Sequence, residues 1–278
     1  MKLGLFVNTN LPKASELCER VLAEAKKCKA EVTVVRHDLQ TVSAQELRPL
    51  VQGADFVVTV GGDGTVLAVV AQAAGQNIPI LAVNAGHLGF LTEEVSAPER
   101  WMERLLRGEY SVERRPLLRV EHGDSVYYAL NDAVLSRSTR SQTTCISAYL
   151  QHALVDRYRG DGVVVCTPTG STAYALAAGG PVLCPTIAAN ALVPLCAHSL
   201  HSRPIVFDCK ETLRLVAEGR DVLWICDGRT VAECAVGDEV TIRTAELSAA
   251  FVRMGDTNFY ERLFGKLKQW GTTEDTKC

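Results

Sequence analysis

Phe56-Val57-Val58-Thr59-Val60-Gly61-Gly62-Asp63-Gly64-Thr65 is the stretch that decides the fold expected for this chain. Its first half, 56–60, is an apolar and β-branched run typical of a buried strand, and it leads directly into the glycine-rich turn 61–65. A helical stretch follows at 66–74. This order of strand, turn and helix is typical of open α/β sheets, which bind ligands at the carboxyl ends of their strands.

The sequence around this stretch repeats the same alternation. Apolar β-type runs occur at 3–7, 32–36 and 78–83, and amphipathic helical stretches occur at 15–27 and from Pro98 to about Leu106. Strands that alternate with helices in this way form βαβ units. The first part of the chain is therefore predicted to be an α/β domain with a Rossmann-like parallel sheet.

After Gly108 the sequence changes to short runs rich in Val, Leu, Tyr and Thr, separated by turn signals such as His122-Gly123-Asp124. Such runs predict a β-rich, sandwich-like domain, with one alanine-rich helical stretch at 171–178. Past about Ala250 a helical pattern returns, with Phe259, Leu263, Phe264 and Leu267 at spacings of three and four. The expected domains are 1–107, joined by the segment 251–278, and 108–250.

Composition limits the classes of partner. The chain of 278 residues is 47% hydrophobic and carries a net charge of −3, so it has no overall field that would attract nucleic acid or an anionic membrane. Its ten cysteines are scattered, contain no CxxC pair and stand partly inside apolar runs. Reduced thiols in a cytoplasmic protein are the expectation, and no run of residues is apolar and long enough to span a membrane.

The glycine turn predicts an anion-binding loop. Gly61, Gly62 and Gly64 permit positive φ and remove side chains, so that successive N–H groups, together with Thr65, can surround a phosphate at a helix N-terminus. Asp63 would repel that phosphate unless it binds a metal ion or accepts a proton from an attacking hydroxyl. The alternative is a plain tight turn in which Asp63 caps the next helix. The loop is neither a P-loop nor a GxGxxG fingerprint.

Two further stretches suggest a nucleotide site. In 161–174 an acidic turn and a buried strand precede a hydroxyl-rich loop and a helix, which Thr169 or Ser171 is expected to cap, leaving amides for a phosphate or a nucleotide edge. Tyr174 offers a ring for stacking on a base; alternatively it is a core tyrosine behind a capped helix. Asn131 and Asp132 can hydrogen-bond a ribose diol and an adenine edge together, or they form an Asx turn.

These motifs resemble those of known kinases. GGDGT is similar to the signature shared by NAD kinases, diacylglycerol and sphingosine kinases and, more loosely, phosphofructokinases. The string DG…TPTGSTAY at 161–174 resembles NAD kinases specifically. The stretches 84–93, 130–134 and 198–204 agree in the expected order, and weaker agreement extends through Asp227-Gly228, Gly237-Asp238 and 266–270. The resemblance covers nearly the whole chain.

The resemblance implies transfer of the γ-phosphoryl group of ATP to the 2′-hydroxyl of the adenosine ribose of NAD. NAD would lie between the domains, with its ribose on Asn131 and Asp132, its 2′-hydroxyl at the catalytic Asp63, and the ATP phosphates on 61–65. A divalent metal, Mg²⁺ above all, would screen the phosphates, and no side chain is assigned as a metal ligand. Family members are commonly homodimers or homotetramers. The remaining NAD contacts that the resemblance implies are Arg159, Asp161, Thr172, Ala173, Tyr174, Ala177 and His198. For His198, hydrogen bonding to the local backbone is an equally good explanation.

The sequence departs from the family at four positions. Ala68 stands where bacterial members often have a basic residue, Ala175 and Ala177 replace polar residues expected at the nicotinamide end, and Ala197 replaces a proline. The alternatives that remain are a lipid kinase of the diacylglycerol or sphingosine type and an NAD(P)-binding sensor without catalysis. The identity of the phosphoryl donor, acceptance of NADH and feedback by NADP are left open.

Overall fold

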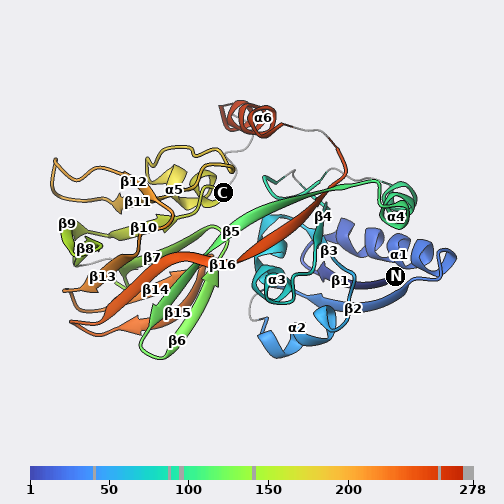
Figure 1. The fold of residues 1–278 in the computed structure, drawn as a ribbon, viewed down its shortest axis with the longest axis horizontal. Coiled ribbons are helices and arrows are strands. Elements are labelled where there is room, and N and C mark those ends of the chain that lie inside the picture. The colour runs from blue at the N-terminus through green and yellow to red at the C-terminus, as the bar shows by residue number, and fades with distance from the viewer. Residues whose placement is uncertain (40–41, 87–88, 94–96, 140–141, 256–257, 272–278) are drawn as a thin grey trace. The chain divides into compact units, whose positions relative to one another are not determined.

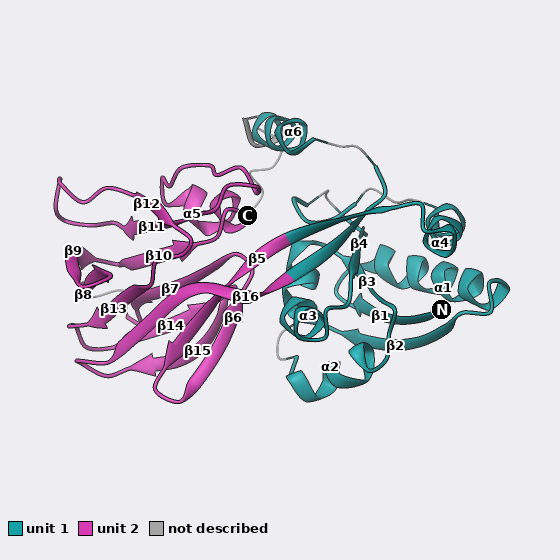
Figure 2. Ribbon diagram, viewed as in Figure 1, with its two compact units in different colours: residues 1–114, 249–278 teal, residues 115–248 magenta. Residues whose placement is uncertain are grey.

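The computed structural model describes residues 1–39, 42–86, 89–93, 97–139, 142–255 and 258–271. The chain forms two compact units, Met1–Arg114 with Ala249–Cys278 (unit 1) and Arg115–Ser248 (unit 2), coloured separately in Figure 2. The expected divisions were after residues 107 and 250. The unit boundaries fall instead inside two long strands, β5 (Ser111–His122) and β16 (Glu239–Arg253), because each of these strands runs on from one unit into the other.

Unit 1 contains the predicted parallel sheet (Figure 1). Its strands lie in the order β2-β1-β3-β4, all parallel. Their bounds are β1 Lys2–Asn8, β2 Glu31–His37, β3 Phe56–Gly61 and β4 Ile80–Asn84. Strand β3 is buried throughout, as its apolar run predicts, and at the end of β16 Phe251 pairs in parallel with Ile80.

Four helices flank these strands. α1 (Pro12–Lys27) and α4 (Pro98–Arg107) share one apolar core with one face of the sheet, while α2 (Ala44–Val51) and α3 (Asp63–Gly75) pack together. Proline at the start of α1 and α4 suits the first helical turn, and Gly108 ends α4 in the left-handed conformation at φ 70°. Helix α2 was not predicted, although Ser43 and Glu46 form a capping box at its start.

Helix α3 begins earlier than predicted. It starts at Asp63, with Gly62 as its N-cap, so the second half of the GGDGT stretch is the first helical turn and not a loop. Gly61, Gly62 and Gly64 do not have positive φ, so the conformational reason given for these glycines was wrong. Gly61 is required for a different reason, because a Cβ there would lie 2.1 Å from Thr65 Oγ1.

Unit 2 is a β-sandwich, which confirms the predicted class. One sheet is antiparallel and has six strands in the order β12-β11-β10-β7-β14-β15; the other is formed by β16, β13, β8 and β9 together with the β5–β6 hairpin. Large side chains from both sheets, such as Trp224 and Leu215, fill one core. The bounds are β6 Ser125–Ala129, β7 Asp132–Arg137, β8 Thr144–Leu150, β9 Ala153–Gly160, β10 Gly162–Cys166, β11 Ala189–Leu195, β12 Ile205–Asp208, β13 Leu213–Ala217, β14 Val222–Cys226 and β15 Arg229–Cys234.

Two predicted helices need correction. The stretch expected at 171–178 is a short 3₁₀ turn, Gly170–Thr172, followed by a single α-turn, α5 (Tyr174–Ala177), because Ala173 between them has ψ −127°. The C-terminal helical pattern does not begin near residue 251, since 251–253 still belong to β16; the helix is α6 (Phe259–Gly271). Within the residues that the structure describes, no helix has the length and apolarity needed to cross a membrane.

Candidate active site

Asp63 stands at the first position of α3, where it is fixed by the backbone of another loop. Its two carboxylate oxygens accept hydrogen bonds from Phe90 N at 2.8 Å and Leu91 N at 3.1 Å. The side chain is therefore not the cap of its own helix, which removes the alternative interpretation as a plain capped turn. Gly89 packs directly against it, because a Cβ at Gly89 would lie 1.7 Å from Asp63 Oδ1.

The start of α3 leaves backbone donors open. The N–H groups of Asp63 and Gly64 occupy the first two helical positions and have no acceptor within the helix. A Cβ at Gly62 or Gly64 would meet nothing within 4 Å, so there is open space beside both residues. A helix N-terminus with free N–H groups and space in front of it favours an anion such as phosphate.

Thr65, predicted as a phosphate contact, has a structural role in the turn. It is buried, and its Oγ1 accepts hydrogen bonds from Gly62 N at 3.2 Å and from Asn8 Nδ2 at 3.5 Å. Gly61 is buried as well, beneath the Thr65 side chain. Thr65 and Gly61 therefore shape the turn, while the backbone of Asp63 and Gly64 is left to bind a ligand.

A buried cluster of ion pairs binds Glu93 and the carbonyl groups of the loop whose N–H groups hold Asp63. Glu93 Oε1 forms ion pairs with Arg253 Nη1 at 2.9 Å and with Arg262 Nη2 at 2.6 Å. The same two guanidinium groups donate to the backbone oxygens of Leu91 at 3.0 Å and Thr92 at 3.1 Å. The carbonyl groups of this loop are thus bound to cations, while N–H groups in it are bound to the Asp63 carboxylate. His87 and Leu88 of the predicted motif lie outside the described residues.

In unit 2, Asn131 and Asp132 are positioned by Asp227, which the sequence motifs include only as weak agreement and without a role. Asp227 accepts hydrogen bonds from the N–H groups of Leu130, Asn131 and Asp132, at 2.8, 2.7 and 3.2 Å. It can do so because Asp227 (φ 47°) and Gly228 (φ 76°) form the two-residue turn between β14 and β15. The Asp-Gly pair announces this hairpin, but nothing in the sequence shows where the carboxylate points.

The carboxyl groups of Asp132, which is buried, and Asp227, which is half-buried, lie close enough to interact. Burial raises the pKa of Asp132 to about 7, and the negative charge of Asp227 adds to this effect. Burial also raises the pKa of Asp227, to about 6, but its three backbone N–H donors oppose the shift. Within the described part of the chain the Asp132 side chain has no hydrogen-bond donor. The protonated form is therefore favoured more at Asp132, which has no donor, than at Asp227, whose charge is stabilised by three N–H groups.

The segment 167–177 packs against the same turn. Thr167 donates through its hydroxyl to Leu130 O at 2.5 Å and through its N–H to Asn131 O at 3.0 Å. Neither Thr169 nor Ser171 caps α5, contrary to expectation: Ser171 Oγ bonds instead to Pro168 O and to the backbone of Leu183. The amides that were expected to bind a phosphate are also used internally, since the N–H groups of residues 170, 171 and 173 donate to Thr167 or Gly170.

The remaining residues predicted in this segment differ in exposure. Thr172 is buried and donates to Thr169 O at 3.1 Å, and Ala173 is half-buried. Tyr174 and Ala177 are exposed one turn apart on α5, so the tyrosine ring is available for stacking. Ala175 is different, because it lies in an apolar cluster with Val134 and Val164. Of the two alanines that stand where the family has polar residues, Ala177 is therefore exposed and Ala175 is packed inside unit 2.

Arg159, Asp161 and His198 form a separate group in unit 2. His198 N donates to Arg159 O at 2.9 Å, and Asp161 binds Arg137 Nε at 2.6 Å, which holds the pKa of Asp161 below its usual range. Strand β10 begins beside this group and ends beside Asp132, where Cys166 pairs with it. Four residue steps of a strand separate the two ends by roughly 14 Å. The predicted NAD contacts thus fall into two groups, one at each end of β10.

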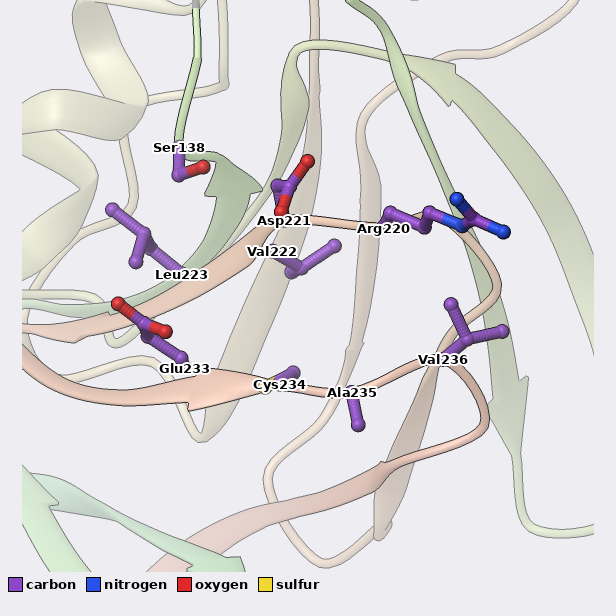
Figure 3. Close-up of a pocket in the computed structure, with 9 residues that line it drawn as sticks. All are labelled: Ser138, Arg220, Asp221, Val222, Leu223, Glu233, Cys234, Ala235 and Val236. Carbon is purple, nitrogen blue, oxygen red and sulfur yellow. The ribbon is translucent and has the colours of Figure 1, made fainter.

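Other candidate features of unit 2 lie apart from these groups. Figure 3 shows a pocket at the β14–β15 hairpin, lined in part by Leu223, Glu233 and Val236, and it contains no predicted site residue. In the described part of the chain one set of potential metal ligands lies close together, namely His122, Cys234 and Asp238, whose ligand atoms are within 4.8 Å of one another. Asp238 is bound at 3.1 Å by His122, at the end of β5, and at 2.8 Å by the Ala235 N–H of the turn between β15 and β16, so hydrogen bonds within the fold account for that arrangement.

Comparisons with known proteins agree with this geometry. The ATP-NAD kinase N-terminal domain family matches residues 29–110, and the ATP-NAD kinase C-terminal domain family matches residues 130–254. The NAD kinase of Caldicellulosiruptor saccharolyticus is 33% identical, over 97% of this chain and 100% of the relative. The NAD kinase of Methanothermobacter thermautotrophicus is 36% identical, over 98% of each chain.

Solved structures give the same result. An NAD kinase from Archaeoglobus fulgidus, crystallised in complex with ATP, aligns with a TM-score of 0.76 at 26% identity and covers 96% of this chain and 99% of that chain. A yeast NADH kinase complexed with NADH has the same fold, with a TM-score of 0.76 at 21% identity over 99% of this chain and 89% of that one. Neither the lipid kinase nor the idle sensor is favoured by these matches. Both domains and nearly the full length agree, so the chain belongs to the NAD kinase family.

Proposed function

We propose that Asp63 is the residue of this NAD kinase that acts on the 2′-hydroxyl of the adenosine ribose of NAD. The enzyme transfers a phosphoryl group from ATP to NAD. One observation carries the assignment of Asp63: its carboxylate is fixed by the N–H groups of Phe90 and Leu91 beside the open N-terminus of α3. A carboxylate held in one orientation next to free N–H groups can accept a proton while a phosphate is bound beside it.

The proposed reaction is an in-line displacement. The ribose 2′-oxygen forms a bond to the γ-phosphorus of ATP as the bond from that phosphorus to the bridging β,γ-oxygen breaks, and ADP leaves. Asp63 accepts the hydroxyl proton and thus orients the attacking oxygen. The N–H groups of Asp63 and Gly64 donate to the phosphate oxygens, with no side chain in the way at Gly62 or Gly64.

The acceptor nucleotide is assigned to unit 2. We infer that Asn131 and Asp132 bind the adenosine ribose, since Asp227 holds their backbone and the Asp132 carboxyl group has no donor among the described residues. In its protonated form Asp132 donates a hydrogen bond as well as accepting one. Tyr174 and Ala177 face solvent together and are assigned to the nicotinamide side, with Thr172 and Ala173 behind them. Arg159, Asp161 and His198, at the other end of β10, are the further contacts proposed.

We also propose that a divalent metal ion, Mg²⁺ in the first instance, acts with ATP. Each Asp63 oxygen uses one acceptor site for a backbone N–H and keeps another, so the carboxylate fits as one oxygen ligand beside phosphate and water. When bound, Mg²⁺ would screen the charge on the phosphates. The His122, Cys234 and Asp238 group offers nitrogen and sulfur, which suit zinc better than magnesium.

The test is formation of NADP from NAD, ATP and Mg²⁺ by the full chain, followed in a coupled assay. Product is expected only when all three are present, and EDTA should abolish it. Absence of product with folded protein and bound NAD would overturn the proposal for Asp63. Replacing ATP by another nucleoside triphosphate or by polyphosphate, and NAD by NADH, would define the donor and the acceptor in the same assay.

A homodimeric or homotetrameric state and a cytoplasmic location are proposed on the resemblance and the cysteines. The nine described cysteines carry no disulfide, and Cys196 alone among them is classed as exposed, as expected for a reducing compartment. Sedimentation equilibrium should give twice or four times the mass of one chain. A monomer at micromolar concentration would contradict the first proposal, and recovery in an oxidising compartment would contradict the second.

A further inference from the structure

Phosphoryl transfer next to Asp63 needs positive charge, and the segments that form the site supply little of it. Helix α3 contains no lysine or arginine, and neither does the stretch 76–93. Ala68, which stands where a basic residue was expected, is buried within α3. Arg253 and Arg262 also contact this loop, but their guanidinium groups are already bound to Glu93 and to backbone oxygens. The charge must therefore come from another segment of the chain or from the metal.

Lys266 of α6 is the side chain that brings such a charge to Asp63. Its Nζ lies 4.5 Å from the centre of the Phe90 ring, and Phe90 is the residue whose N–H binds Asp63. The helix is fixed in this position from the preceding turn, because Arg262, four residues before Lys266, binds Glu93 and Thr92 O, and Leu263 is buried. Residues 262, 263 and 266 share one helix face that is turned toward the Asp63 loop.

The ammonium group of Lys266 is held near the carboxylate without being bound to it. Within the described residues Lys266 takes part in no hydrogen bond or ion pair, and its side chain is partly buried against Phe90. This burial lowers the pKa of Lys266, while the negative charge of Asp63 acts in the opposite direction. An ammonium that has lost water on one side and has no fixed anion gains most from an anion brought by a ligand.

We propose that Lys266 binds the phosphoryl group of the nucleoside triphosphate that lies next to Asp63, and so supplies the charge absent at Ala68. This inference rests on the proposed function of Asp63. Lys266 donates its N–H groups to oxygens of the γ-phosphate and balances the charge that gathers as the phosphoryl group moves from ADP to the ribose. Lys266 packs on Phe90, and Phe90 belongs to the loop that orients Asp63. The positions of the proposed base and of the cation therefore both depend on this loop.

The experiment compares Lys266→Gln with Lys268→Gln in the full chain. Lys268 lies on the same helix and is exposed, and the structure gives it no ion pair within the described residues, which makes it a matched control for loss of one charge. Calorimetry with ATP and Mg²⁺ measures donor affinity whether or not turnover occurs. Calorimetry with NAD and thermal melting show that the fold and the acceptor site are intact. Steady-state rates then separate KM for ATP from kcat.

Lys266→Gln is expected to lose about tenfold to hundredfold in ATP affinity and in kcat/KM for ATP, as for loss of a charge-assisted hydrogen bond. NAD affinity should stay within twofold, Lys268→Gln should match the wild type, and Lys266→Arg should recover part of the loss. Equal ATP affinity and kcat/KM in Lys266→Gln and the wild type would overturn the inference, as would equal losses in both glutamine variants. If the wild type binds ATP in a Lys266-dependent way but makes no NADP, the fault lies with the proposed function and not with Lys266.

Discussion

Asp63 in unit 1 and Asp132 in unit 2 carry the same side chain in opposite surroundings. Asp63 receives two backbone N–H groups, stands at the positive end of α3 and has Lys266 near it. Asp132 receives no donor among the described residues and lies beside a second carboxylate, Asp227. The two residues are of the same type, so the difference comes from their surroundings. Asp63 has donors for its carboxylate, whereas burial and a neighbouring charge raise the pKa of Asp132.

The comparison also separates two ways of holding a site. At Asp63 the acidic side chain is the group that acts, and the backbone of 90–91 holds it. At Asn131 and Asp132 the relation is reversed, because the acidic side chain of Asp227 holds the backbone on which the acting groups sit. Loss of an aspartate should accordingly affect turnover in the first case, and stability together with NAD binding in the second.

The largest effect is expected from Asp63→Asn. The amide keeps a hydrogen-bond acceptor for the loop but removes the base, so turnover should fall by about 10³- to 10⁴-fold, with NAD affinity within threefold. NADP formation and NAD calorimetry measure the two quantities. Asp55→Asn is the control, since Asp55 is exposed and directly precedes Phe56, the first residue of β3. Turnover of Asp63→Asn within tenfold of the wild type would remove the contrast between the two aspartates.

The next effect is expected from Asp227→Ala. Three part-buried N–H groups lose their acceptor, so the free energy of unfolding should fall by about 3 kcal/mol and NAD affinity by at least about tenfold. Urea unfolding and calorimetry measure these changes. Asp221→Ala is the control, because Asp221 has φ 55° against 47° for Asp227 and makes no comparable set of bonds in the described structure. Equal losses in both variants would mean that left-handed backbone strain, and not the lost acceptor, is the cause.

The smallest effect on activity is expected from Asp132→Asn, which should instead remove a pH dependence of stability. The pKa of Asp132 is raised to about 7 in the folded protein and is about 4 when unfolded. As pH rises through this window the unfolded chain releases the proton first, so the wild type loses stability of up to about 4 kcal/mol between pH 4 and pH 7. Asp132→Asn does not titrate, so its stability relative to the wild type should be greater at pH 8 than at pH 5. Urea unfolding at both pH values tests this; an unchanged difference would show that Asp132 is already ionised at pH 5.

The sequence predicted much of the fold and the central residue. The alternation of strands and helices predicted the parallel sheet, and the short β-runs predicted the sandwich. Asp63 was identified because glycine-rich turns after buried strands have a recognisable pattern. Helix α2 was missed although its capping box, Ser43 and Glu46, is visible in the sequence. The helix at 171–178 was overestimated, since alanine content indicates helix propensity but does not show the break at Ala173.

The features that could be predicted from the sequence are local ones. They are the periodicity of strands and helices, the turn residues, and the residue types at Gly61–Thr65, Asn131–Asp132 and 167–174. The partners that give these residues their roles were decided only by the tertiary structure. Phe90 and Leu91 reach Asp63 through their backbone, which carries no residue signature, and Arg253 and Arg262 lie about 160 and 170 residues from Glu93 along the chain. The raised pKa of Asp132 likewise depends on burial and on Asp227, 95 residues away. Hydrogen bonds and charge interactions act over a few ångströms of space, so their pattern becomes visible only when distant segments of the chain have been packed together.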